Sequence, residues 1–189
     1  NTLIKDEGFK GVGIKLMGDF ANVKISRNYM LVGAAVLDIN LSKLCYQKGI
    51  SGYEFLFTIP GSIGGNIFMN AGCYNQEIRE KLLSVIFFDI KDNKVYEKNI
   101  SELKFEYRRG FQKKNTIILY GKFKINYGNK NNIKSLMKEY DSIRNRTQPQ
   151  KVNCCGSIFK NPLNHSAWQL IKSSVDDSFY DGPVKLSKK

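Results

Sequence analysis

The segment FTIPGSIGGNIFMNAGCYNQEI, residues 57–78, constrains the fold more than any other part of the chain. Four of its glycines, at positions 61, 64, 65 and 72, lie within twelve residues, and no charged residue occurs before Glu77. Glycine has no side chain and tolerates positive φ, so backbone N–H groups here can converge on an anion or on a flat ligand. A tight buried turn between packed elements needs the same glycines, and composition alone leaves both interpretations open.

The segment has neither of two common phosphate-binding motifs. It lacks the Gly-Lys-Ser/Thr of a P-loop and the GxGxxG that follows the first strand of a dinucleotide fold. It contains no lysine either, so a pyrophosphate would be held by backbone dipoles, with the hydroxyl of Ser62 as a further donor.

Composition and charge narrow the class of protein. The 189 residues are 42% hydrophobic and 12% aromatic, enough for one sizeable domain, or for one domain and part of a second. The formal net charge is +13, but the basic residues are scattered singly and in pairs, so we expect no nucleic-acid partner. No apolar run approaches the roughly 20 residues that cross a bilayer, and no signal peptide is recognisable, so we expect a cytoplasmic protein without a membrane partner.

The cysteines and the histidine do not predict a metal site. Cys45, Cys73, Cys154 and Cys155 fit no zinc or CxxC spacing, and reduced thiols are expected. The single histidine, His165, has no partner histidine and no acidic cluster nearby.

Periodicity predicts a mixed α/β body to about residue 130, then a helix and the beginning of a second region. Helices are expected within 37–50, with Gly49 as the C-terminal stop, over 129–148, and around 168–171. The ranges expected to form strands are residues 1–16 (two strands around a turn at 6–8), 28–36, 77–100 (two strands around a turn at 91–93), 115–128 and 154–160.

Three motifs in this order resemble the UDP-N-acetylenolpyruvoylglucosamine reductase, or MurB, family. IPGSIGGNIFMNAGCYNQEI at 59–78 matches the flavin-binding pattern of that family. FEYRRGF at 105–111 matches its F-x-Y-R motif, and GSIFKNP at 156–162 matches its G-S-x-F-K-N-P motif. The opening NTLIKDEGFKGVGIKL is similar to a further family segment entered at the Asn, so the resemblance covers nearly the whole chain.

The resemblance implies an α+β fold with two domains. Residues 1–145 would form an FAD-binding domain of the PCMH/VAO-like type, without its N-terminal part. Residues 146–189 would begin a smaller substrate-binding domain. The implied protein is a monomeric bacterial cytoplasmic enzyme of peptidoglycan synthesis. With non-covalent FAD it would use NADPH to reduce UDP-N-acetylglucosamine enolpyruvate to UDP-N-acetylmuramate.

The resemblance also implies roles for individual residues. Arg108 would stabilise the negative charge that develops beside the substrate carboxylate, and Ser157 would donate a proton to the carbanion. Tyr107, Lys160 and Asn161 would bind the substrate. The residues expected to line FAD are Asn1, Pro60, Gly61, Ser62, Ile63, Gly64, Gly65, Asn70, Ala71 and Gly72.

The chain departs from the family in several places. It is shorter than the family's chains, and the family's third catalytic residue, a glutamate near the C-terminus, is not in this sequence. Residues 173–180, SSVDDSFY, replace a glycine-bearing segment of the family. Two alternatives therefore remain: a flavoprotein oxidase of the same superfamily, with Cys73 as a candidate for covalent attachment, or a flavin-binding remnant without catalysis.

Overall fold

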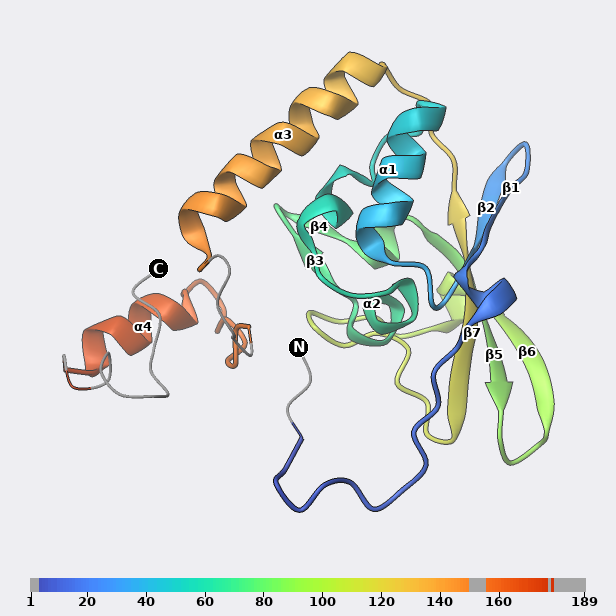
Figure 1. Cartoon of the computed structure of the whole chain (residues 1–189), viewed down its shortest axis with the longest axis horizontal. Coiled ribbons are helices and arrows are strands. Elements are labelled where there is room, and N and C mark those ends of the chain that lie inside the picture. Colours follow the sequence, from blue (N-terminus) through green and yellow to red (C-terminus); the bar gives the residue numbers. More distant parts are fainter. Residues whose placement is uncertain (1–3, 150–155, 177, 179–189) are drawn as a thin grey trace. The chain divides into compact units, whose positions relative to one another are not determined.

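The computed structural model describes residues 4–149, 156–176 and 178. The chain divides into two compact units: Val12–Ser142, and Asn1–Gly11 together with Ile143–Lys189 (Figure 1). The domain boundary expected between residues 145 and 146 stays a prediction.

The larger unit is built on a five-stranded sheet in the order β1-β2-β7-β5-β6. Every pairing in the sheet is antiparallel. The second described sheet is a hairpin of β3 and β4. The strands are β1 (Val23–Ile25), β2 (Tyr29–Gly33), β3 (Gly72–Cys73), β4 (Gln76–Glu77), β5 (Leu82–Asp89), β6 (Lys94–Asn99) and β7 (Thr116–Lys124).

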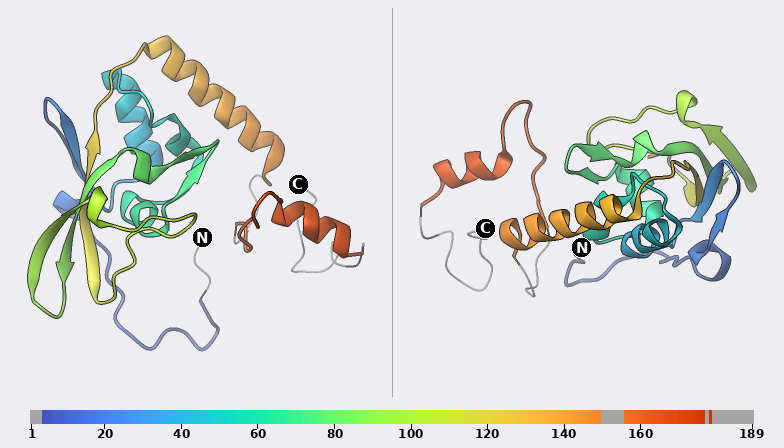
Figure 2. Two further views of the ribbon diagram at one scale, coloured as in Figure 1. Left: turned by 180° about the vertical axis from the view of Figure 1, so that it is seen from behind. Right: turned by 90° about the horizontal axis from the view of Figure 1, so that it is seen from above.

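Helices α1 and α2 lie on one face of this sheet (Figure 1), and Figure 2 shows this arrangement from behind and from above. The α-helices are α1 (Asp38–Lys48), α2 (Ile63–Met69), α3 (Lys130–Thr147) and α4 (Ala167–Ser174). The 3₁₀ helices are η1 (Gly18–Ala21), η2 (Glu54–Thr58), η3 (Ile78–Glu80) and η4 (Ile100–Glu102).

The core forms between the helices and the sheet because each contributes alternating or helically spaced apolar side chains. Strand β5 buries Leu82, Val85 and Phe87, and α2 buries Ile63 and Ile67, four residues apart. Helix α2 meets the sheet at Gly121 of β7, where a Cβ would lie 2.8 Å from Ile67 Cδ1. The absent side chain of Gly121 therefore lets α2 approach the strand closely.

Most elements predicted from periodicity are confirmed. The strands β2, β5, β6 and β7 fall within their expected ranges, with the β5–β6 turn at residues 90–93. Helix α1 ends at Gly49, which has a φ of 69°, because a left-handed C-cap favours glycine. Helix α3 buries Ile133, Met137 and Tyr140, and Tyr140 stacks on Tyr74 with ring centroids 4.0 Å apart.

The prediction of two strands within residues 1–16 is wrong for the described residues 4–16. The turn forms, with Gly8 N–H donating to Lys5 O at 2.9 Å, but no strand flanks it. Alternating apolar and polar residues form a stable strand only where a neighbouring strand supplies hydrogen bonds. No described strand pairs with this segment, and its apolar residues Phe9, Val12 and Ile14 remain largely exposed. Residues 156–160 form no strand either, and 154–155 lie outside the described residues.

No helix in the described part of the chain is both long and apolar enough to span a membrane.

Candidate functional site

The glycine-rich segment contains a helix that its composition does not predict. Pro60–Ser62 form a turn that leads into α2, although two glycines in a seven-residue helix each cost about 1 kcal/mol relative to alanine. Tertiary contacts offset this cost. The N–H groups of Ile63 and Gly64 donate to the carbonyls of Val36 and Ala34, at 2.9 and 2.8 Å.

The glycines of this segment differ in what surrounds them. A Cβ on Gly64 would lie 2.9 Å from the Cβ of Ala34, and a Cβ on Gly72 would overlap the carbonyl oxygen of Gln76. These two positions need glycine for the packing of the protein itself. Gly61 has a φ of 151°, which other residues rarely adopt.

Gly65 is different because nothing in the described part of the chain excludes a side chain there. It is exposed, and the nearest atom to a Cβ would be Ser62 Oγ at 3.9 Å. The N–H groups of Ser62 and Gly65 donate no hydrogen bond within the described part of the chain. An open glycine face beside two available donors suits the approach of an anionic ligand, so these residues fit the pyrophosphate of FAD.

Asn70 ends α2 in the left-handed conformation, with a φ of 46°, and is fully buried. Its side-chain amide donates to Glu77 Oε2 at 3.0 Å and to the backbone carbonyl of Glu106 at 2.9 Å. Its amide oxygen accepts from the N–H of Arg79 at 3.4 Å. The side chain expected to line FAD therefore joins α2 to the segment that carries Tyr107 and Arg108.

Tyr107 and Arg108 occupy the tip of a tight turn. Glu106 and Arg109 exchange backbone hydrogen bonds of 2.8 and 3.0 Å across it. Arg108 has a φ of 57°, which costs a non-glycine residue about 1–2 kcal/mol. Its guanidinium lies 4.9 Å from the centroid of the Tyr107 ring. No described carboxylate is within ion-pair distance of Arg108, whereas Arg109 faces Glu106 at 3.7 Å.

The turn is tied to α2 by the residues that follow it. The N–H groups of Gly110 and Phe111 donate to the carbonyls of Phe68 and Ile67, both at 3.0 Å. These are carbonyls of the last helical turn, which have no partner within the helix. The structure thus brings together, through backbone contacts, two motifs about 40 residues apart in the sequence (59–78 and 105–111).

Ser157, Lys160 and Asn161 belong to the other compact unit, where all three are exposed. Asn161 Oδ1 accepts a hydrogen bond of 3.0 Å from the N–H of Ala167, at the start of α4. Asn161 therefore caps a helix in addition to its predicted role with the substrate. Asn1, the remaining predicted cofactor residue, lies outside the described residues.

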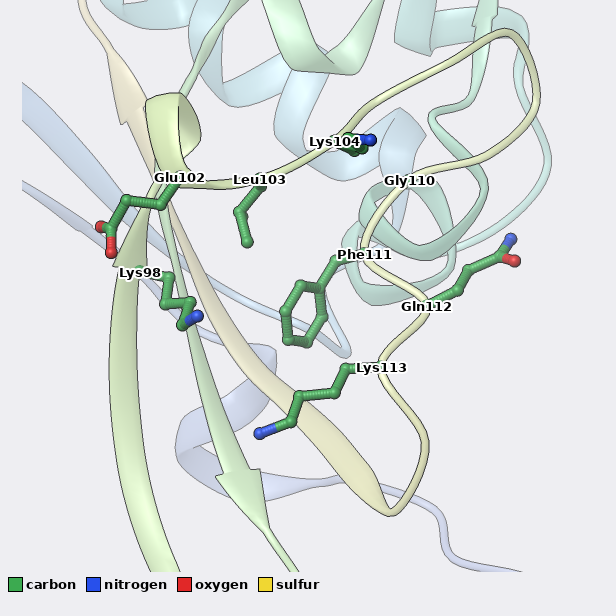
Figure 3. Close-up of a pocket in the computed structure, with 8 residues that line it drawn as sticks. All are labelled: Lys98, Glu102, Leu103, Lys104, Gly110, Phe111, Gln112 and Lys113. Carbon is green, nitrogen blue, oxygen red and sulfur yellow. The ribbon is translucent and has the colours of Figure 1, made fainter.

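A pocket of about 230 Å³ lies beside the same segment (Figure 3). Phe111 points into it, and Lys113 points toward Asp89, with Nζ 2.6 Å from Oδ2. This bond lowers the pKa of Asp89 and raises that of Lys113. Because Asp89 neutralises Lys113, the pocket offers an anion little more than surface lysines. The residues that line it are Lys98, Glu102, Leu103, Lys104, Gly110, Phe111, Gln112 and Lys113.

Sequence reasoning missed Asp38 and Asn66, which lie beneath the glycine-rich turn. Asp38 is fully buried; its Oδ1 accepts a bond of 2.6 Å from Asn66 Nδ2, and its Oδ2 has no hydrogen-bond partner. Burial raises the pKa of Asp38 to about 7, against the opposing effect of the Asn66 bond. An aspartate in the first turn of an amphipathic helix is common, so the sequence carried no signal of this contact.

Cys73 lies in β3, and its thiol donates to the carbonyl of Phe55 at 3.5 Å. No group of three or more His, Cys, Asp or Glu side chains among the described residues is placed to hold a metal ion.

No family model matches the chain. Curated relatives named UDP-N-acetylenolpyruvoylglucosamine reductase do match. Those of Rickettsia peacockii and Pelagibacter ubique are 42% and 40% identical over the whole chain, which covers 63% and 64% of their lengths. That of Rickettsia massiliae is 42% identical over 90% of the chain and 58% of its own length. The chain thus spans less than two thirds of the length of these relatives.

The crystal structure of MurB from Thermus caldophilus has a similar fold, with a TM-score of 0.80 and 32% sequence identity over 89% of this chain and 61% of that one. The fold and the site therefore define a mixed α/β domain of the kind found in that reductase. The chain belongs to the UDP-N-acetylenolpyruvoylglucosamine reductase (MurB) family.

Proposed function

We propose that this chain is part of a flavin-dependent reductase. The enzyme would use NADPH to reduce UDP-N-acetylglucosamine enolpyruvate to UDP-N-acetylmuramate for peptidoglycan. The observation that carries the proposal is the open face of Gly65 beside the available N–H groups of Ser62 and Gly65, held close to the Tyr107–Arg108 turn. The relatives named for this reductase support the same assignment.

The cofactor would be FAD, bound non-covalently in a domain of the PCMH/VAO-like type. When bound, FAD would carry a hydride from NADPH to the enolpyruvyl double bond. The N–H groups of Ser62, in the turn before α2, and of Gly65, in the first turn of α2, would hold its pyrophosphate. Ala71 and Gly72, which follow the buried Asn70 and are half-buried, would continue the surface that contacts FAD.

The reaction leaves negative charge on the carbon next to the substrate carboxylate. Arg108 would stabilise that charge, because its guanidinium is always protonated and its planar fork matches a carboxylate. Tyr107 would support the guanidinium through the contact seen between them. Ser157 would deliver the proton, and Lys160 and Asn161 would bind oxygens of the UDP-sugar.

We propose further that the complete protein is a monomer of the bacterial cytoplasm, with no nucleic-acid partner. The scattered basic residues of this chain support the absence of a nucleic-acid partner.

The proposal is tested by an anaerobic visible spectrum of the complete protein. The yellow flavin colour should bleach on addition of NADPH and return on addition of UDP-N-acetylglucosamine enolpyruvate. A protein that cannot be loaded with FAD would refute the proposal. Flavin that stays on the denatured protein would instead indicate covalent attachment, as in the oxidases.

Replacing Gly65 by alanine separates binding from folding. Because a Cβ here meets no atom of the described residues closer than Ser62 Oγ at 3.9 Å, and alanine favours a helix, the variant should be about 0.5–1 kcal/mol more stable without FAD. The same methyl group would occupy the face proposed for the cofactor, so the dissociation constant for FAD should rise at least about tenfold, roughly 1.4 kcal/mol. Urea unfolding and fluorescence titration measure the two effects, and unchanged FAD affinity would place the pyrophosphate elsewhere.

Replacing Arg108 by alanine should leave the reduction of bound flavin by NADPH at its normal rate. The reoxidation of the flavin by the enolpyruvyl substrate should slow by about 10²–10³-fold, as expected when one charge-stabilising donor is lost. Stopped-flow absorbance separates the two half-reactions. Arg109→Ala is the matched control, because Arg109 faces Glu106 and should leave both rates unchanged; equal losses in the two variants would assign the effect to the fold of the turn.

A further inference from the structure

The carboxyl of Asp38 lies directly beneath the glycine-rich turn. The backbone N–H of Asp38 donates to the carbonyl of Gly61 at 3.2 Å, and its Oδ1 accepts from Asn66 at 2.6 Å. Its Oδ2 lies 3.2 Å from the position that a Cβ of Gly61 would occupy. Asp38 therefore contacts the turn on one side of Ser62 and helix α2 on the other.

The surroundings of Oδ2 disfavour a negative charge. Asp38 is fully buried, and Oδ2 has no donor among the described residues. The polar groups that contact Asp38 are Asn66 from α2 and the backbone of Gly61 from the turn. Ser42, four residues further along α1, is also buried, and its Oγ has no partner in the described part of the chain. Among the described residues, no charged side chain contributes to the shift of the Asp38 pKa, which burial raises to about 7. At pH 6 the carboxyl is therefore mostly neutral, and above pH 8 it is mostly ionised.

An ionised Asp38 would place a negative charge below the same turn whose outer face offers N–H groups to an anion. Like charges in a partly desolvated site repel each other, so the pyrophosphate and an ionised Asp38 disfavour each other. Neutral Asp38 adds no such repulsion. It keeps the bond to Asn66, which fixes α2 relative to the turn.

We infer that Asp38 is a positioning residue for flavin binding, and that the turn accepts the pyrophosphate well only while Asp38 is neutral. This inference rests on the proposed function. By linkage, a bound pyrophosphate favours the protonated carboxyl as much as the protonated carboxyl favours the pyrophosphate. FAD affinity should then be constant where Asp38 is already neutral and should fall as the pH rises through about 7.

The test is the dissociation constant of FAD for the complete apoprotein, measured by fluorescence between pH 6 and 8.5. FAD is a suitable probe because its pyrophosphate diester does not titrate in this range. For the wild type the constant should rise about tenfold from pH 6 to 8.5. Asp38→Asn, which is uncharged at every pH, should bind FAD at pH 8.5 about as tightly as the wild type does at pH 6. Its profile should vary less than twofold.

Asp19→Asn is the matched control, because Asp19 is an exposed aspartate of the same compact unit and its loss should leave the wild-type profile intact. If the FAD affinity of Asp38→Asn falls with rising pH as it does in the wild type, the inference is overturned while FAD binding stays established. Should Asp38→Asn fail to fold, the wild type alone decides. A wild-type FAD affinity that does not change between pH 6 and 8.5 would contradict the inference. A wild type that binds no FAD at any pH would overturn the proposed function itself, and the inference with it.

Discussion

Replacing Ser157 by alanine should slow the transfer to the enolpyruvyl substrate by about 10³-fold, within the range expected when a general acid is removed. The reduction of bound flavin by NADPH should keep its wild-type rate, because no proton from Ser157 is needed there. The side chain of Ser157 is exposed, so its hydroxyl is accessible to a substrate. In contrast, the hydroxyls of Ser173 and Ser174 both donate to the carbonyl of Leu170 in α4.

The two half-reactions are followed separately by anaerobic stopped-flow absorbance, first with NADPH and then with the substrate. Ser173→Ala serves as the control, since it removes a hydroxyl that is occupied within α4 and should change neither rate. Normal reoxidation in Ser157→Ala would remove Ser157 as the donor. Loss of both half-reactions would mean that the change disturbed folding or flavin binding.

The regular elements could be predicted because their side chains are patterned by the core that they face. Strand β5 alternates buried and partly buried positions except at Ser84 and Val85, which are both buried. Helix α3 repeats buried residues at helical spacing, so local periodicity indicates the geometry of both elements. The end of α1 could be predicted for a similar reason, because Gly49 adopts the left-handed cap itself. In each case the determining interaction is local or lies on one face of the element.

The elements around the site could not be predicted in this way, because contacts between distant segments determine them. Helix α2 forms against glycine propensity because Ile63 and Ile67 are buried and Ala34 and Val36 accept its first N–H groups. The contact of Asp38 with Gly61 likewise joins residues 23 positions apart. The family motifs indicated candidate site residues, but not that Asn70 would hold the Tyr107–Arg108 turn in place.

Replacing Gly110 by alanine should strongly destabilise the larger unit. A Cβ at this position would overlap the carbonyl oxygen of Ile67 and lie 2.8 Å from the backbone nitrogen of Asn70. Both atoms belong to the backbone at the end of α2, so a rotamer change cannot relieve the overlap. The segment must move away, which strains or breaks the bonds from Gly110 and Phe111 to the carbonyls of Phe68 and Ile67. We expect a loss of at least about 3 kcal/mol in the free energy of unfolding.

The loss is measured by urea unfolding of the complete protein. Gly13→Ala is the matched control, because a methyl group at Gly13 would meet no described atom within 4 Å and its φ is not positive, so the stability should change by less than about 1 kcal/mol. The displacement caused by Gly110→Ala would also move Arg108, two residues earlier, away from α2. Gly110→Ala protein that still folds should therefore bind FAD yet reoxidise slowly with the enolpyruvyl substrate, as Arg108→Ala does. If Gly110→Ala were as stable as the wild type, α2 and the Tyr107–Arg108 turn would not be held as closely as these contacts require.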